Sequence, residues 1–246
     1  MQKVFMNAAR RQILRWSTAL PVAAFALPGN SDSQASRYRQ SAPSADGIGK
    51  IYMGREIAGV MGWQGAAWLE REEREKEERG DLLLRELHLY PGMNVADIGA
   101  GTGYHARRIA PLLGAGVVYA VDLQPQMIVL LAEGAKKAGL GNIKPVLASA
   151  TDVKLADATI DLALMVDVYH ELEFPYEVMQ SVVRAVKPGG KVVLIEYRAE
   201  DPRVPIKQLH KMSESQVRKE AAQHALVHER TASTLPWQHV LIFRKR

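Results

Sequence analysis

The sequence predicts an α/β fold in which a doubly wound, mostly parallel seven-stranded sheet ends in an antiparallel hairpin. From Met93 onward, apolar runs alternate with segments of helical periodicity, and this alternation places helices on both faces of a parallel sheet. The run Ile160–Val166 is almost entirely apolar, as is typical of a strand buried on both faces. The last two strands are joined by Thr-Ala-Ser-Thr-Leu-Pro, which is too short for a helical crossover, so we expect them to pair antiparallel.

The expected elements follow one another without an internal repeat. The strands are Met93–Ile98, Gly116–Val121, Ile143–Leu147, Ile160–Val166, Lys191–Tyr197, Ala225–Thr231 and Trp237–Arg244. The helices are Gly103–Leu113, Pro125–Ala138, Phe174–Val186 and a last one from Ser213 to about His224. A proline in the first turn of the second helix and the Lys-Pro-Gly-Gly stretch at 187–190 are typical signals for the start and the end of a helix.

The composition is that of a globular protein with room for one α/β domain and an extension. The chain has 246 residues, of which 47% are hydrophobic and 24% are charged. It contains no cysteine, which excludes disulfides, thiolate catalysis and cysteine-ligated zinc. Residues 1–35 carry four basic residues and one acidic residue, which leaves 28 basic and 26 acidic residues in the remainder. Most of the net charge of +5 therefore lies in the leader, and we expect no nucleic-acid binding through a general positive field.

The first 35 residues predict an export signal. The stretch Arg-Arg-Gln-Ile-Leu-Arg at 10–15 resembles a twin-arginine signal, and an uncharged stretch follows at 16–31. Small residues at 24–26 or 33–35 offer cleavage sites. The uncharged stretch is short and interrupted by two prolines, so we expect no more than transient membrane contact through it. The expected location is the periplasm or cell envelope; the alternative is a cytoplasmic protein with an N-terminal extension.

Three further segments are expected after this signal. Residues 36–50 are rich in Ser, Ala, Gly and Pro and predict a linker. Residues 51–90 predict a helical lid, and the α/β domain proper occupies 91–246. Within the lid, residues 70–79 are almost all charged with both signs mixed, and they predict a solvated helix face with i,i+4 ion pairs.

A glycine-dense turn follows the first strand of the α/β domain. The stretch VADIGAGTGYHARR at 95–108 contains Asp97 and then Gly99, Gly101 and Gly103. A strand, a glycine turn and a helix in succession let the backbone approach a nucleotide-like ligand closely. The spacing is Gly-x-Gly-x-Gly, not the Gly-x-Gly-x-x-Gly of dinucleotide sites, and the turn has no basic residue for a phosphate. Both features disfavour a dehydrogenase.

Acidic residues end four successive strands of the expected sheet. These residues are Asp97, Asp122, Asp152 and Asp167. Ligands of open α/β sheets bind beyond the carboxyl ends of the strands. A carboxylate can accept hydrogen bonds from both hydroxyls of a ribose, and Asp122 is placed for that role. One such aspartate alone is equally consistent with a helix cap, but four at one edge of the sheet indicate a shared site.

At these residues the chain resembles the class I S-adenosylmethionine-dependent methyltransferases. The resemblance rests on VADIGAGTG, on VYAVD, on the acidic position after the third strand and on VKPGG before the fifth, and it covers roughly residues 80–246. The aspartate of VYAVD lies 25 residues after Asp97. More narrowly, WLEREEREKEE, MVDVYHEL and EYRAEDPRVPIKQLHKM resemble a bacterial subgroup of predicted methyltransferases. The family implies a Rossmann-like fold and methyl transfer to a small-molecule acceptor.

The resemblance also implies S-adenosylmethionine as the cofactor and assigns its parts to particular positions. The three glycines admit the methionine end, the first aspartate holds its amino-acid part and the second accepts the ribose hydroxyls. Two apolar residues line the adenine slot, and two residues after the third strand meet the adenine edge. The complete implied set is Asp97, Gly99, Gly101, Gly103, Asp122, Leu123, Met127, Thr151, Asp152 and Asp167. An acidic rim complements the sulfonium and ammonium charges of this cofactor.

Methyl transfer to a hydroxyl or an activated carbon also requires a proton acceptor. His170, just beyond the fourth strand, is the expected general base and Tyr169 is the alternative, although a structural histidine is equally consistent with the sequence. Tyr197, Arg198 and His210 are expected to contact the acceptor, or else to form ion pairs with neighbouring acids. No metal is expected, because a zinc signature would need a second histidine at position 174, which is Phe174.

Two functions of different kind remain open at this point. The first is an enzyme that methylates a small molecule. The second is a non-catalytic binding protein of the cell envelope that retains the fold, a reading favoured by the leader because the cofactor is made in the cytosol. The oligomeric state and the methyl acceptor stay undetermined.

Overall fold

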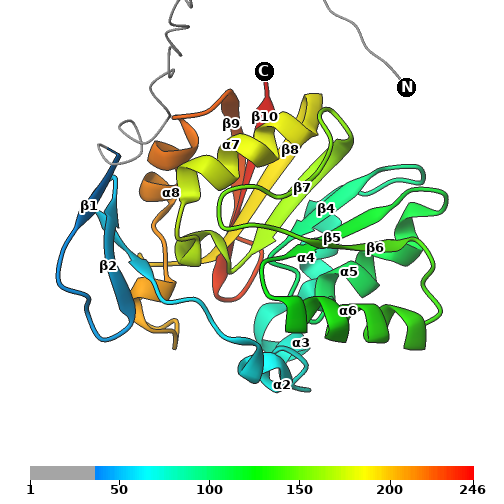
Figure 1. Cartoon of the computed structure of the whole chain (residues 1–246), viewed down its shortest axis with the longest axis horizontal. Coiled ribbons are helices and arrows are strands. Elements are labelled where there is room, and N and C mark those ends of the chain that lie inside the picture. Colours follow the sequence, from blue (N-terminus) through cyan, green and yellow to red (C-terminus); the bar gives the residue numbers. More distant parts are fainter. Residues whose placement is uncertain (1–36) are drawn as a thin grey trace, which may run out of the picture.

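The computed structural model describes residues 37–246, so the expected export signal lies outside the described residues. The main sheet has seven strands in the order β6-β5-β4-β7-β8-β10-β9 (Figure 1). The first five pair in parallel, and β10 runs antiparallel to both of its neighbours. The strands are β4 (Val95–Ile98), β5 (Val118–Asp122), β6 (Ile143–Leu147), β7 (Ile160–Val166), β8 (Val186–Tyr197), β9 (Leu226–Ala232) and β10 (Gln238–Lys245). The predicted doubly wound sheet with a C-terminal hairpin is confirmed.

The helices of the main domain begin and end close to the predicted positions. They are α5 (Tyr104–Ile109), α6 (Pro125–Lys137), α7 (Pro175–Ala185) and α8 (Glu214–Ala221), with single 3₁₀ turns η2 (Ala110–Leu113), η3 (Tyr169–Glu171) and η4 (Gln208–His210). Proline opens both α6 and α7, and the Ser213 side chain caps α8 by accepting from the Gln216 amide. Within residues 37–246, no helix combines the length and the apolar character that crossing a bilayer requires.

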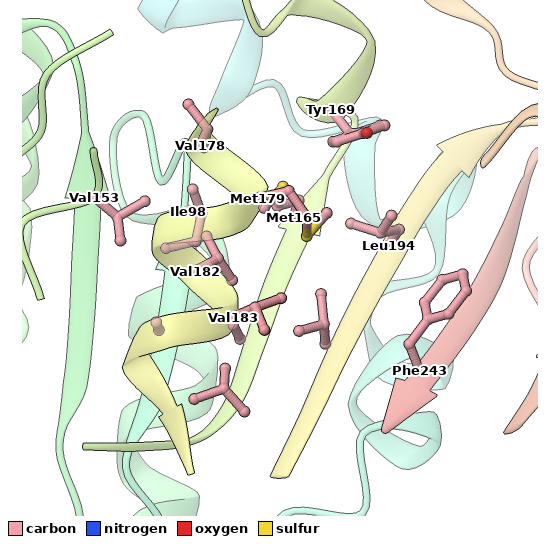
Figure 2. Close-up of a cluster of buried hydrophobic side chains, with 14 of the residues drawn as sticks. Ile98, Val153, Met165, Tyr169, Val178, Met179, Val182, Val183, Leu194 and Phe243 are labelled. Carbon is pink, nitrogen blue, oxygen red and sulfur yellow. The ribbon is translucent and has the colours of Figure 1, made fainter. Parts of the chain in front are cut away.

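Alternation along the strands divides the hydrophobic core between the two faces of the sheet. On β7, Ala163 and Met165 face a cluster that includes α7 and α8, while Leu162 and Leu164 face a cluster that includes α5 and α6. In Figure 2, four residues of α7 pack toward the sheet next to side chains of β4, β7 and β8: Val178, Met179, Val182 and Val183 pack near Ile98, Met165 and Leu194. Burial of both faces fixes the carboxyl ends of the parallel strands at one edge, where the site lies.

The segment before the main domain differs from the prediction. Residues 38–58 were expected to be a linker and the start of a helical lid, but they form a three-stranded antiparallel sheet of β1 (Tyr38–Gln40), β2 (Gly47–Tyr52) and β3 (Arg55–Ala58). The reason is a two-residue hairpin turn in which Met53 and Gly54 both have positive φ, the geometry that joins twisted strands. Tyr38 and Tyr52 are buried in this small sheet.

The lid proper occupies residues 63–86. It consists of η1 (Trp63–Gly65), α2 (Ala66–Leu69), α3 (Arg74–Glu78) and α4 (Gly80–Glu86), in agreement with the helical prediction for this part. The expectation of a fully solvated charged face is wrong for Arg74 and Glu78, which are only 5% and 4% exposed. These two residues form the expected i,i+4 ion pair at 2.8 Å, but the pair is turned inward, over the acidic rim of the sheet.

Candidate functional site

The glycine turn after β4 has the backbone geometry that its spacing predicts. Gly99, Gly101 and Gly103 have φ angles of 71°, 54° and 83°, in the left-handed region that side chains disfavour. A Cβ atom at Gly99 would lie 2.6 Å from the Val168 side chain, and one at Gly101 would lie 2.7 Å from Leu69 of the lid. The three glycines therefore allow both the turn itself and the close approach of neighbouring segments to it.

Asp97 lies beneath this turn and has an incomplete set of partners. It is 2% exposed, and its Oδ2 atom has no hydrogen-bond partner among the described residues. Burial raises the pKa of Asp97 to about 7, although the Ala106 amide and the charge of Arg74 oppose the shift. A buried carboxylate oxygen without a partner is unfavourable, so Asp97 is suited to bind a cationic group of a ligand.

Asp122 connects the end of β5 to the glycine turn. One carboxylate oxygen accepts a hydrogen bond from the Gly101 amide at 2.8 Å, and the other accepts from the Gln124 amide at 2.8 Å. Burial raises its pKa, and these two amides oppose the shift. A carboxylate has about four lone-pair sites, so Asp122 retains acceptor capacity for a ribose. Of the two residues expected to line the adenine slot, Leu123 is 48% exposed beside it, and Met127 is buried in the core.

The residues after β6 make structural contacts in the described part of the chain. The Asp152 carboxylate accepts from the Lys154 amide at 2.7 Å and forms an ion pair with Arg184 of α7 at 3.2 Å. These partners lower the pKa of Asp152 against the opposing effect of burial. Thr151 beside it is partly buried. A role for these two residues at the adenine edge stays a prediction.

The lid lies across the glycine turn and the segment after β5. The Trp63 amide donates to the Gln124 side chain at 2.7 Å, and Gln124 donates back to the Met61 carbonyl at 3.0 Å. Glu70 accepts hydrogen bonds from Thr102 in the turn and from Arg107 of α5. In Figure 1, α2 and α3 lie together beside α5. The lid therefore closes over the edge of the sheet where the cofactor is expected.

The ion pair between Arg74 and Glu78 of the lid also contacts residues on the other side of the acidic rim. Arg74 lies 3.3 Å from the Nε2 atom of His105, and Glu78 accepts from the Tyr197 hydroxyl at 3.4 Å. The charge of Arg74 also acts on Asp97. Arg74 and Glu78 could not be predicted as site residues from the sequence, because they resemble the other members of a highly charged run.

Asp167 ends β7 in a buried acidic group. Its Oδ2 atom accepts from the Gln238 side chain at 3.1 Å, and its Oδ1 atom has no partner among the described residues. Burial raises the pKa of Asp167 well above its ordinary value, and the nearby Glu78 and Glu196 carboxylates raise it further. Asp167 thus faces β8 and β10, and its contact with a cofactor stays a prediction.

His170 is held by a buried carboxylate. Its Nδ1 atom lies 2.6 Å from Oε2 of Glu196, a residue with 0% exposure, and its Nε2 atom lies 3.2 Å from Nδ1 of His210. Burial disfavours the charged imidazole, but the Glu196 carboxylate, together with Glu171, outweighs this effect and raises the pKa of His170 to about 10. The His170 ring is therefore charged and enclosed, whereas a general base requires a neutral, accessible imidazole. This environment does not favour the expected general-base role.

His210 and Glu171 complete this cluster. His210 lies in η4, and its Nδ1 atom is 3.1 Å from Oε1 of Glu171. The other oxygen of Glu171 accepts from the amide of Met61, just before the lid, at 3.2 Å. The structure thus brings two of the predicted residues, His170 and His210, together from positions 40 residues apart.

Three other predicted residues are engaged elsewhere. Tyr169, the alternative base, is fully buried in the hydrophobic core (Figure 2), and burial raises its pKa well above the ordinary value. Tyr197 is buried beside Trp237, and burial raises its pKa also. Arg198 donates from its terminal nitrogens to the carbonyls of Leu235, Pro236 and Gln238 and so holds the connection to β10. Tyr169 is therefore corrected from a cleft residue to a core residue.

Comparison with known families identifies this architecture. Residues 96–194, which run from β4 into β8, match the family model described as a methyltransferase domain. Residues 96–194 thus form a methyltransferase domain, and its fold is that of a SAM-dependent methyltransferase. The match spans the glycine turn, Asp122 and the loop after β7, so the predicted family is confirmed on the residues that form the cleft.

Individual relatives show which known methyltransferases this domain resembles. Sterol methyltransferase-like 1 of Botryococcus braunii is 36% identical over 109 residues, which are 44% of this chain and 28% of the relative. A ubiquinone/menaquinone biosynthesis C-methyltransferase of Idiomarina loihiensis is 29% identical over 108 residues, 43% of each chain. The chain spans less than half the length of these curated relatives. A SAM-dependent methyltransferase from Aquifex aeolicus shares the fold, with a TM-score of 0.72 and 23% identity over 76% of this chain and 100% of that one.

The methyltransferase domain is expected to release a proton when S-adenosylmethionine binds. The cationic groups of the cofactor lower the pKa of Asp97 from about 7, so a carboxyl that is partly protonated near neutral pH becomes ionised. Affinity then rises several-fold from about pH 6 to about pH 7.5. Calorimetric titration in buffers of different ionisation enthalpy measures the released proton. In Asp97→Asn, which cannot ionise, we expect the proton release to vanish; equal release in both proteins would contradict the assignment.

Proposed function

We propose that the protein transfers a methyl group from S-adenosylmethionine to a small-molecule acceptor. The observation that carries this proposal is the unpartnered Asp97 oxygen beneath the glycine turn, next to an Asp122 carboxylate that the same turn orients. A scaffold retained only for binding a partner has no need of an incompletely paired buried carboxylate. The site therefore favours the enzyme over the non-catalytic alternative.

The residues of the cleft fit the parts of this cofactor. Asp97 would hold the ammonium group, Asp122 the ribose hydroxyls and Leu123 one face of the adenine. When bound, S-adenosylmethionine supplies an electrophilic methyl group on a sulfonium. The protein contributes mainly orientation and the exclusion of water, because an in-line displacement depends on the alignment of the two reacting atoms. The lid, which bonds to both the glycine turn and Gln124, is placed to exclude water.

The acceptor is proposed to enter on the side of β7 and β8. Curated relatives are named for sterol methylation and for ubiquinone and menaquinone biosynthesis, and this supports a small, lipid-soluble acceptor. His210, whose side chain is 23% exposed, is an accessible member of the residues predicted to contact it. We propose no nucleic-acid partner, since the net charge outside the leader is only +2.

Calorimetric titration with S-adenosylmethionine tests the cofactor site. We expect saturable binding by the unmodified chain and at least tenfold weaker binding by Asp122→Asn, because the amide exchanges one ribose acceptor for a donor; tenfold corresponds to about 1.4 kcal/mol. The matched control is Asp157→Asn, since the Asp157 side chain is 72% exposed. The proposal fails if millimolar cofactor does not bind, and the assignment of Asp122 fails if both variants bind alike.

The destination of the protein is proposed to be the cell envelope, on the basis of the twin-arginine-like leader. Export of this kind moves folded proteins, so a bound cofactor could travel with the domain. N-terminal sequencing of the protein from fractionated cells measures this directly. We expect a mature chain that begins after residue 26 or 35 in the envelope fraction. An intact Met1 in the cytosol would refute export.

A further inference from the structure

We propose that His170, Glu171 and His210 form a binding site for one divalent transition-metal ion. The Nε2 atom of His170, the Oε1 atom of Glu171 and the Nδ1 atom of His210 converge on one point between β7, β8 and η4, where sequence spacing alone predicts no metal. The three distances between these atoms are 3.2 Å for the two nitrogens, 3.1 Å from His210 to Glu171 and 3.7 Å from His170 to Glu171.

These distances are close to the separations that a shared ion imposes on its ligands. Zinc binds imidazole nitrogen and carboxylate oxygen at about 2.0–2.2 Å, so two ligand atoms at a tetrahedral angle lie roughly 3.3–3.6 Å apart. The three measured separations lie close to this range on either side. Little movement of side chains is therefore needed to place an ion among the three atoms.

Other groups hold the ligands in the orientation that metal binding requires. Glu196 lies 2.6 Å from Nδ1 of His170, so that this nitrogen donates, and an ion would bind at Nε2 in place of the second proton of the ring. A carboxylate behind a ligating histidine in this manner is a recurrent feature of metal sites. Glu171 is oriented in a similar way, since the Met61 amide binds one of its oxygens and the other faces the two histidines.

The charge balance also favours a cation at this position. Glu196 is fully buried, and the side chain of Glu171 is 14% exposed. Within residues 37–246, neither carboxylate forms an ion pair with a lysine or an arginine, and besides one backbone amide each they contact only imidazoles. Buried carboxylates are stabilised by opposite charge, and a divalent ion bound to the two histidines would supply it in place of the proton on His170.

A set of two histidines and one carboxylate leaves coordination positions open. Such sets occur with zinc and with iron(II), and the open positions accept water or a substrate oxygen. A bound ion would occupy the Nε2 face of His170, the face from which a general base would take a proton. Metal binding and the expected base role of His170 are therefore mutually exclusive.

Titration of the full chain with cobalt(II) and zinc(II), after removal of metals and of any affinity tag, tests the proposal. We expect one equivalent of cobalt(II) to bind and to give the visible absorption bands of a nitrogen and oxygen site, and zinc(II) to displace it. Loss of an outer-shell partner alone weakens metal sites by about 10–100-fold, so His210→Ala is expected to weaken binding by more than about 100-fold.

Two controls keep the result interpretable. His88→Ala removes an exposed histidine outside the cluster and is expected to keep the full metal affinity. Binding of S-adenosylmethionine to His210→Ala, measured by calorimetry, reports that the variant is folded, and it separates a failure of this site from a failure of the cofactor site. Absence of stoichiometric metal binding, or equal affinity in His210→Ala and His88→Ala, would overturn the proposal.

Discussion

The hydrogen bond from the Gly101 amide to Asp122 is the interaction on which the cleft depends. It joins the turn after β4 to the end of β5, and it forms only because these strands are adjacent and parallel. Gly101 adopts a positive φ in this turn, which a residue with a side chain would disfavour. The same bond fixes the distance between the two aspartates of the rim, Asp97 at the end of β4 and Asp122 at the end of β5. In the proposed binding mode, the positions of the methionine end and the ribose of a cofactor would follow from that distance.

The acidic rim is closed by a lid that is itself charged. Glu70 bonds to the turn, and Arg74 brings a positive charge near Asp97. This arrangement reduces the cost of burying several carboxylates in one place, because charges in a low-dielectric interior need opposite charges or hydrogen bonds nearby. A cationic cofactor and a divalent ion would act in the same direction, at the Asp97 end and at the Glu171 end of the rim.

The succession of strands along the chain and the glycine turn could be predicted because each depends on local chemistry. Apolar runs of five to seven residues, such as Ile160–Val166, have few alternatives to a buried strand, and the short link before β10 permits only a hairpin. The sheet of residues 38–58 could not be predicted in this way. It depends on a hairpin turn at Met53 and Gly54, and methionine is not a residue that signals such a turn.

The site residues also divide into those that local sequence predicts and those that it does not. Asp97 and Asp122 lie at the carboxyl ends of β4 and β5, so the parallel sheet alone brings them together. Tyr169 and His170 are adjacent in sequence, but the turn η3 directs the first into the core and the second toward Glu196, a choice that no periodicity encodes. The contact of His170 with His210 depends on the path of the loop after β8. Contacts that depend only on tertiary packing, such as those of His170 with Glu196 and His210, could therefore not be predicted from the sequence.

Hydrogen–deuterium exchange of the full chain, with and without S-adenosylmethionine, tests most directly whether the cofactor binds between the glycine turn and the lid. We expect slower amide exchange at residues 99–103 and also at residues 61–79, because the two segments enclose the bound cofactor and bond to each other through Glu70 and Thr102. Slower exchange in some other region, with both of these segments unchanged, would contradict the central claim.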